Sequence, residues 1–211
     1  DGVIVLCHDE NLKRTTGLDA AVTSTSYDKI AGLDAGSWKD DSYRGEKMPT
    51  LDAYLDLLRG TDCHPVIEIK MEGVEEAVID AVRAKKLVDT TTVIAFSEKV
   101  VAEVRRIEPK LCVAFLYSEK LKDGFDPEGN ADRLAKLLTE KCERLGTHVL
   151  DLNHKLLSEK LVAELRSKGI HVWCWTVDEP ERMNELLDWG GESITTNRPD
   201  VLTEVLKGRS K

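Results

Sequence analysis

The stretch Pro65-Val66-Ile67-Glu68-Ile69-Lys70 reads as a short buried strand that ends in one carboxylate and one ammonium group. Side chains two positions apart on a strand point the same way, so Glu68 and Lys70 should face a common space. Ile67 and Ile69 should then pack on the opposite side. Two interpretations are open for the charged pair: an ordinary ion pair at a strand end, or part of a functional site.

Apolar strand segments alternate with helical stripes along the rest of the chain. Six strand-helix units follow residue 64, and one strand and one helix precede it. The earlier strand is expected at residues 3–7, and the earlier helix should begin after Thr50, whose side chain can cap it. Repeated alternation of this kind with apolar strands predicts a parallel sheet covered by helices.

The expected strand ends favour a barrel over a doubly wound sheet. Polar or hydrogen-bonding residues stand at the C-terminal end of nearly every strand, namely Glu68 and Lys70, Ser97, Tyr117, Asn153, Trp175 and Asn197. A barrel with its site on that face has this distribution. A doubly wound sheet would concentrate such residues at one switch point, usually with a glycine-rich phosphate loop, and the sequence has no GxGxxG or GxxxxGK[ST]. The expected fold class is therefore α/β, a TIM (β/α)8-type barrel.

Length and composition predict a single domain over residues 1–211. A chain of 211 residues with 41% apolar residues can bury one sizeable core. A formal charge of -9 argues against a nucleic-acid or anionic-membrane partner, and no apolar run approaches the roughly 20 residues that a membrane helix needs. A small anionic substrate would need a local cation to hold it.

Five cysteines, odd in number and widely spaced, favour buried free thiols over a disulfide framework.

The chain begins with Asp1-Gly2 directly before an apolar run. Asp-Gly before a strand is a hairpin signal, but the first strand of that hairpin is absent. We therefore expect a longer parent chain, in which any signal peptide would lie upstream. The cytoplasm is slightly favoured as the compartment, and a periplasmic or secreted location stays open. The sequence leaves the oligomeric state open as well.

Three groups of motifs, in this order, resemble the glycerophosphodiester phosphodiesterase family. Residues 5–17 (VLCHDENLKRTTG) are similar to the family's apolar strand followed by His-Asp and Leu-x-Arg-Thr-Thr-Gly. Residues 48–51 (MPTL) and 68–70 (EIK) match its Pro-Thr-Leu and Glu-Ile-Lys elements. Residues 175–177 (WTV) and 195–200 (TTNRPD) resemble its Trp-Thr-Val and Thr-Asp-x-Pro-Asp signatures. Each is weak alone, but in this order over the whole chain they are specific.

The resemblance implies a (β/α)8 barrel that hydrolyses a small-molecule glycerophosphodiester to glycerol 3-phosphate and an alcohol, with a divalent cation, Ca²⁺ or Mg²⁺. It implies a catalytic histidine at His8 and a metal-ligating carboxylate at Glu68. It also implies a phosphate-facing cation at Lys70 and a pocket wall near the glycerol at Trp175. The chemistry agrees, because a metal can neutralise charge on the phosphoryl group while an imidazole moves a proton near neutral pH.

The chain departs from the family pattern in two respects. The family's His-Arg-Gly motif and Glu-x-Asp pair, which supply a second histidine, an arginine and two more metal ligands, are absent from the sequence. We therefore expect a barrel that is N-terminally incomplete in this chain, with its first two strands upstream. Asn197 stands where the family usually has Asp, which removes one charge from that strand end.

Two alternative functions stay open. A lysine at the end of a barrel strand is the usual placement for a Schiff-base aldolase, although an ion pair with Glu68 would keep Lys70 protonated. Borohydride trapping of Lys70 with carbonyl substrates would identify such an enzyme. The missing motifs and Asn197 also allow a non-catalytic barrel module that binds phosphorylated ligands, and an upstream sequence without Glu-x-Asp would favour it.

Overall fold

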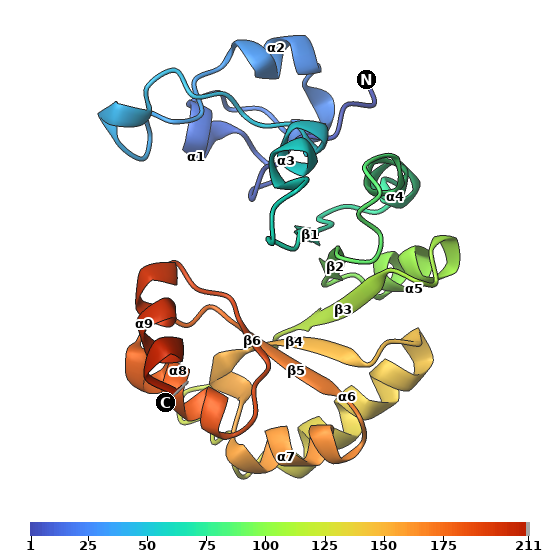
Figure 1. The fold of residues 1–211 in the computed structure, drawn as a ribbon, viewed down its shortest axis with the longest axis vertical. Helices are drawn as coiled ribbons and strands as arrows, with labels where there is room; N and C mark the ends of the chain where they lie inside the picture. Colours follow the sequence, from blue (N-terminus) through green and yellow to red (C-terminus); the bar gives the residue numbers. More distant parts are fainter. Residues whose placement is uncertain (210–211) are drawn as a thin grey trace. The chain divides into compact units, whose positions relative to one another are not determined.

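The computed structural model describes residues 1–209, and in them all six strands form one parallel sheet (Figure 1). Each strand pairs with the one that precedes it in the sequence, and the strands are β1 (Val66–Glu68), β2 (Thr92–Ala95), β3 (Cys112–Tyr117), β4 (Val149–Asn153), β5 (His171–Trp175) and β6 (Ser193–Ile194). This unbroken order is that of a barrel, because a doubly wound sheet reverses its strand order at a switch point. The predicted parallel α/β architecture is confirmed.

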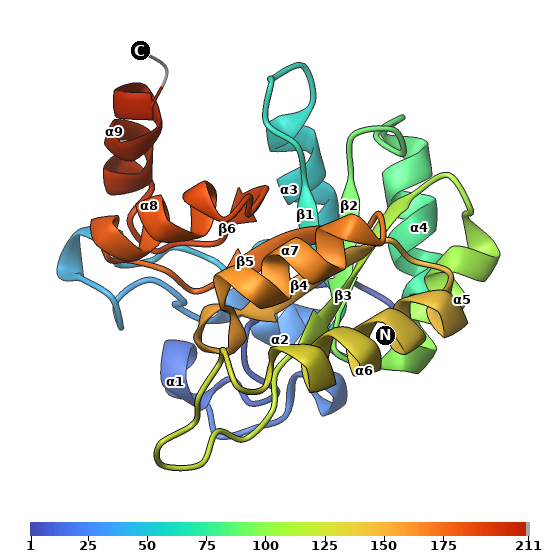
Figure 2. The same cartoon turned by 90° about the horizontal axis from the view of Figure 1, so that it is seen from below.

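Helices connect the strands and precede the first of them. The longer helices are α3 (Leu51–Leu58), α4 (Glu75–Ala84), α5 (Glu98–Ile107), α6 (Ala131–Leu145), α7 (Glu159–Ser167), α8 (Pro180–Asp188) and α9 (Pro199–Arg209). Helix α6 packs against α7, α7 against β5, and α8 lies beside α9 (Figures 1 and 2). None of the helices within residues 1–209 combines the length and apolar character needed to cross a membrane.

Side-chain caps begin several of these helices. Thr50 accepts a hydrogen bond from the backbone N–H of Ala53 at 3.1 Å, as predicted for α3. Ser97 and Ser158 accept equivalent bonds at the starts of α5 and α7. Each cap satisfies one backbone N–H that the first helical turn leaves unpaired. Gly169, with φ of 73°, follows the end of α7 in the left-handed conformation that glycine tolerates best.

The two faces of the sheet are unlike. One face is apolar and fully buried, and its residues are Ile67, Val93, Ala95, Val113, Phe115, Leu150, Leu152, Val172 and Cys174. This face lies toward the helices, since Lys141 of α6 sits over the ring of Phe115. The alternate positions form the opposite face, which carries Glu68, Asn153 and Trp175 at the strand ends, whereas Tyr117 lies on the same face as Phe115. Period-two alternation thus separates the core of the sheet from its functional face.

Residues 1–65 and 74–91 form a compact unit that is separate from the one containing residues 66–73 and 92–209. Its apolar cluster contains Leu12, Ile30 and Met48, so this segment has a small core of its own. The short elements around that core are α1 (Lys13–Thr16), α2 (Tyr27–Gly32) and two 3-10 turns, Val22–Ser24 and Asp41–Tyr43. The predicted organisation of residues 1–211 as one domain stays a prediction.

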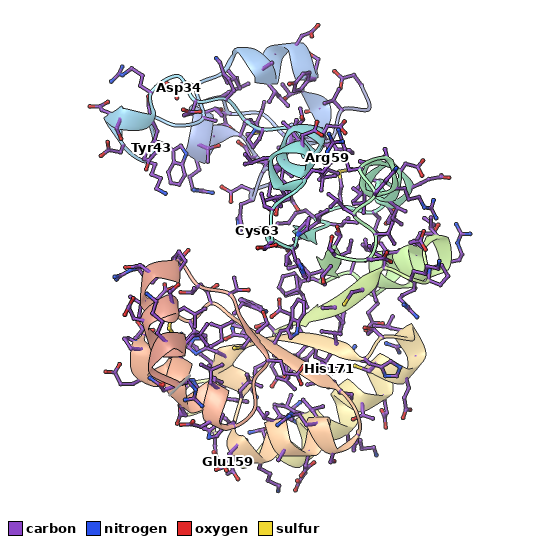
Figure 3. All side chains as sticks on the ribbon, viewed as in Figure 1. Asp34, Tyr43, Arg59, Cys63, Glu159 and His171 are labelled. Carbon is purple, nitrogen blue, oxygen red and sulfur yellow. The ribbon has the colours of Figure 1, made fainter. Side chains whose placement is uncertain are left out.

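Asp34 organises the turn that closes this segment (Figure 3). Its carboxylate accepts hydrogen bonds from the backbone N–H groups of Gly36, Ser37 and Gly45 and from the Ser37 hydroxyl. These donors hold the pKa of Asp34 well below its usual range. A side chain at Gly36 would collide with the carbonyl oxygen of Tyr43, so this turn requires glycine there.

The predicted strand at residues 3–7 is wrong. Val5 forms only an isolated antiparallel bridge with Thr50, and the N–H of Leu6 donates to the carbonyl of Pro49 at 2.9 Å. An apolar run becomes a strand only when a neighbour supplies a ladder of hydrogen bonds. Within residues 1–209 this run meets the short segment that leads into α3, which offers too few partners.

The cysteine prediction is confirmed in part. All five thiols are free, and Cys142 and Cys174 are buried. Cys63 and Cys112 are exposed, contrary to prediction. Cys112 is the first residue of β3, and its exposure follows from this position at the start of the strand, since the next four residues are buried.

The buried face of the sheet predicts a large cost for truncating Leu150 in β4. Leu150 is fully buried, whereas Leu57 of α3 is 75% exposed. Leu150→Ala should lower the free energy of unfolding by about 2–5 kcal/mol, because it removes buried methyl groups and leaves a cavity. Leu57→Ala, the same chemical change, should stay within about 0.5 kcal/mol of the wild type. Urea denaturation of both variants checks this, and equal losses would contradict the assignment of faces.

Candidate active site

Glu68 and Lys70 lie together at the end of β1. The Lys70 ammonium Nζ is 2.7 Å from Glu68 Oε2, and about a third of the lysine side chain and a quarter of the glutamate side chain are exposed. Ile67 and Ile69 are buried on the opposite side. The N–H of Ile69 donates to the carbonyl of Ile94 at 3.0 Å, so pairing with β2 continues beyond the last residue of β1. The predicted division of these four side chains between two faces is confirmed.

Trp175 at the end of β5 is held from two sides. Its indole Nε1 donates to the backbone carbonyl of Asp151 on β4 at 3.1 Å. Phe96, which follows β2, meets the indole edge-on, with ring centroids 5.6 Å apart and an interplanar angle of 87°. This arrangement is a favourable geometry for an aromatic pair. Trp175 therefore presents a fixed, half-buried aromatic surface, and its part as a pocket wall stays a prediction.

Asp151 is the feature of this sheet face that sequence reasoning missed. Its side chain is buried at 2% exposure, and its Oδ1 has no hydrogen-bond partner. Burial, and then the negative charge of Glu68, raise the pKa of Asp151 to about 7. The two carboxyl groups therefore interact electrostatically. The sequence does carry one signal for this residue, since Asp151 is the one acidic residue inside the apolar run of β4. Burying an unpaired carboxylate is costly, so an acidic residue at such a position indicates a specific role.

Asn197 has a specific partner that accounts for the amide at this position. Asp178 accepts hydrogen bonds from the Asn197 backbone N–H at 2.8 Å, from its side-chain Nδ2 at 3.0 Å and from the Thr196 hydroxyl at 3.0 Å. These donors lower the pKa of Asp178. An aspartate at position 197 would lack the Nδ2 donor and would place a second negative charge against Asp178.

His8 belongs to the N-terminal unit and is 77% exposed. Its Nδ1 lies 2.8 Å from Asp9 Oδ1, and Arg14 Nε donates to Asp9 Oδ2 at 2.5 Å. The Arg14 hydrogen bond, and then that of His8, lower the pKa of Asp9 to about 2. The guanidinium of Arg14 also lies 4.8 Å from the ring centroid of Trp38. Because Asp9 occupies Nδ1, Nε2 is the ring nitrogen free for proton transfer.

The carboxyl groups in residues 1–209 provide only part of a metal site. No cluster of three or more His, Cys, Asp or Glu side chains in that range could hold a metal ion. Glu68 is partly exposed, and Asp151 has a buried oxygen without a partner. Hard cations such as Mg²⁺ take carboxylate oxygens, often from one or two residues, and complete their shell with water and phosphate oxygens. The donor chemistry of this face therefore fits a divalent cation.

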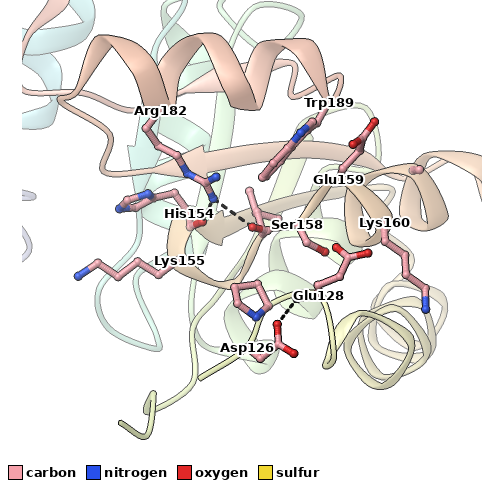
Figure 4. A pocket seen from close by; sticks show the side chains of 12 residues that line it. Asp126, Glu128, His154, Lys155, Ser158, Glu159, Lys160, Arg182 and Trp189 are labelled. Carbon is pink, nitrogen blue, oxygen red and sulfur yellow. Dashed lines mark hydrogen bonds between the residues drawn. The ribbon is translucent and has the colours of Figure 1, made fainter. Parts of the chain in front are cut away.

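A groove of about 800 Å³ lies in the unit that contains the sheet, at the loops that precede α6 and α7 and at α8 (Figure 4). Arg182 donates to the carbonyls of His154 and Leu157 at 2.6 and 3.0 Å and stacks on Trp189. Burial, and then the charge of Arg182, lower the pKa of His154. The groove contains none of the predicted site residues, and its arginine is occupied in joining α8 to the loop before α7.

The glycerophosphoryl diester phosphodiesterase family model matches residues 1–201. The chain belongs to this family. A "Glycerophosphodiester phosphodiesterase" of Bacillus subtilis is 29% identical over 99% of this chain and 73% of its own length. The family match covers the segments of His8, Glu68, Lys70 and Trp175.

Solved structures of this family have the same fold. A glycerophosphodiester phosphodiesterase from Agrobacterium tumefaciens superposes with a TM-score of 0.79 at 26% identity, covering 99% of this chain and 82% of its own. An Oleispira antarctica phosphodiesterase, in complex with the product sn-glycerol-3-phosphate, superposes with a TM-score of 0.83 at 22% identity, covering 98% and 81%. The predicted α/β barrel class is confirmed by this likeness.

The raised pKa of Asp151 predicts that the metal-free protein loses stability as pH rises. The folded protein binds a proton at Asp151 up to about pH 7, whereas the unfolded chain releases it near pH 4. Between these values the folded state binds more protons, so the free energy of unfolding falls as pH rises, by about 4 kcal/mol in total from this group.

Urea denaturation in EDTA at pH 5 and pH 8 measures this loss. Asp151→Asn should remove most of the difference between the two pH values, because the amide does not ionise. Asp123→Asn, at an exposed loop position, makes the same change in net charge and should leave the difference intact. An unchanged pH dependence in Asp151→Asn would contradict the assignment.

Proposed function

We propose that this chain is a metal-dependent phosphodiesterase that hydrolyses glycerophosphodiesters to glycerol 3-phosphate and an alcohol. The observation that carries the proposal is the family match over residues 1–201, which contains the Glu68–Lys70 pair at a strand end. The named activity of the Bacillus subtilis relative and the product bound to the Oleispira antarctica protein support the same reaction.

Lys70 is proposed to hold the phosphoryl group. A glycerophosphodiester is anionic, and the chain carries a formal charge of -9, so binding requires a local positive group. The contact between Lys70 and Glu68 holds the ammonium group beside the carboxylate at the end of β1. When substrate binds, a phosphate oxygen can replace the Glu68 oxygen as the partner of Lys70.

Glu68 is proposed to hold the divalent cation, Ca²⁺ or Mg²⁺. A bound cation of this kind neutralises charge that develops on the phosphoryl oxygens. The chain's own contribution is a carboxylate that is partly buried and fixed in direction by its place in β1. Release of Lys70 to the substrate leaves both Glu68 oxygens free for that role.

His8 is proposed as the residue that transfers a proton in the reaction. The contact with Asp9 orients the imidazole, and Nε2 then accepts a proton from an attacking hydroxyl or donates one to the departing alcohol. Trp175 is proposed to pack its fixed indole face against the glycerol part of the substrate. The ion pair of Lys70 weighs against a Schiff-base aldolase, which needs a neutral amine.

Hydrolysis should be observable as glycerol 3-phosphate released from glycerophosphocholine in a coupled assay. Removal of cations with EDTA should abolish release, and addition of Ca²⁺ or Mg²⁺ should restore it, because the cation stabilises charge in the transition state. The absence of release with either cation would refute the proposal. In that case, binding of glycerol 3-phosphate without turnover would favour the non-catalytic alternative.

Substitutions at the proposed residues should separate their roles. His8→Gln should lower kcat by about 10²–10⁴-fold, the usual contribution of a proton-transfer group. Lys70→Met should raise KM and lower kcat, because the phosphoryl group loses its cation. His148→Gln and Lys120→Met are matched controls outside the proposed site and should stay within about twofold of the wild type. Full activity of His8→Gln would refute its catalytic role.

A further inference from the structure

We propose that Arg14 and Trp38 are positioning residues for His8, which they hold through the carboxylate of Asp9. This inference deepens the proposed function and rests on it in one respect, the part of His8 in proton transfer. Trp38 lies outside every motif by which the chain resembles its family. All four side chains belong to the N-terminal unit, and direct contacts join each one to the next.

Both carboxylate oxygens of Asp9 have a partner. Oδ1 lies 2.8 Å from His8 Nδ1, and Oδ2 accepts a hydrogen bond from Arg14 Nε at 2.5 Å. The carboxylate therefore cannot rotate without breaking one of these contacts. Because its pKa is lowered to about 2, Asp9 is ionised near neutral pH and can only accept hydrogen bonds. In the neutral imidazole of His8 the proton then belongs on Nδ1, which leaves Nε2 as the basic nitrogen.

The exposure of His8 makes a further support for Asp9 necessary. The His8 side chain is 77% exposed and that of Asp9 is 30% exposed. A contact between exposed charged groups is weak, because water screens it and both side chains lose freedom when they form it. The contact between His8 and Asp9 alone would therefore leave the imidazole free to change its rotamer. A second bond to Asp9 fixes the carboxylate and, through it, the direction of Nε2.

Trp38 supplies the surface on which Arg14 rests. The guanidinium carbon of Arg14 lies 4.8 Å from the centroid of the Trp38 ring, within the range of a cation–π contact. The indole Nε1 donates to the backbone carbonyl of Ala35 at 2.9 Å, so the ring is itself anchored. Ala35 follows Asp34, whose carboxylate organises the turn that closes this segment. The turn at Asp34 thus fixes Trp38, Trp38 fixes Arg14, and Arg14 fixes Asp9.

A second arginine–tryptophan pair in the chain provides a matched control. The guanidinium of Arg182 also lies 4.8 Å from a tryptophan ring centroid, that of Trp189, in the groove that contains none of the predicted site residues. Arg182 donates to the backbone carbonyls of His154 and Leu157. Truncation of Trp189 therefore removes an equivalent stacking contact from an arginine that holds backbone groups, whereas truncation of Trp38 acts on an arginine that holds Asp9.

The tautomer of His8 tests the inference without reference to turnover. Imidazole ¹⁵N chemical shifts of the histidine-labelled protein at pH 9 distinguish a proton on Nδ1 from one on Nε2. The wild type should have the Nδ1–H tautomer. Asp9→Asn should convert it to Nε2–H, because the amide can donate to Nδ1 while its oxygen accepts from Arg14. Trp38→Leu should give a mixture of both tautomers, whereas Trp38→Phe, which keeps an aromatic face, and Trp189→Leu should keep the wild-type form.

Kinetics with glycerophosphocholine provide the second measurement. Trp38→Leu should lower kcat about tenfold and change KM by less than about twofold, because it misdirects the imidazole without removing a substrate contact. Trp38→Phe should recover most of the loss, and Trp189→Leu should match the wild type. Arg14→Gln, at an exposed position, should have the same effects as Trp38→Leu and replaces it if that variant does not fold.

A wild-type His8 tautomer in both Trp38→Leu and Arg14→Gln would overturn the inference and leave the contacts of Arg14 a purely structural role. An equal loss of kcat in Trp189→Leu would overturn it as well. Failure of the proposed function has a different result. If glycerophosphocholine is not hydrolysed but the tautomer still shifts in Trp38→Leu, the positioning of His8 stands and the function fails. If hydrolysis occurs and neither variant shifts the tautomer, the reverse holds.

Discussion

The parallel ladder that joins the six strands in sequence order is the constraint on which the rest of the structure depends. It fixes the direction of every second side chain, so one face of the sheet is uniformly apolar and the other carries carboxylates, amides and aromatic rings. A slip of one residue in any strand would exchange the two faces. The buried side chains on the helix side therefore hold the charged residues of the other face in position.

The charged side chains at the strand ends are mostly compensated by side chains in direct contact with them. Lys70 compensates Glu68, and the amide of Asn197 compensates Asp178. Asp151 has no such compensation, and burial together with the charge of Glu68 opposes its ionisation. In an acidic chain, one such uncompensated carboxyl stands out as a position that needs a positive partner. The departure of Asn197 from the family pattern, in contrast, is explained within the chain by its contacts with Asp178.

The family resemblance and the strand pattern identified Glu68, Lys70, Trp175 and His8 from sequence, and the structure shows the surroundings of each. Asp151 could not be found in this way. Its neighbours in the sequence are apolar, and nothing in the run distinguishes a buried carboxyl that is paired from one that is not. That distinction depends on β3 and β5, which lie beside β4 only after folding. The failed strand at residues 3–7 has the same origin, because pairing partners are a property of the fold.

The sequence by itself determined the alternation of strands and helices, the cap at Thr50, the separation of Glu68 and Lys70 from Ile67 and Ile69, and the family. These features depend on short-range periodicity and on ordered motifs, which are local. The tertiary structure alone decided that Lys70 contacts Glu68, that Phe96 and the Asp151 carbonyl hold Trp175, and that a buried oxygen of Asp151 has no partner. These features depend on register and burial between distant segments, which no local pattern encodes.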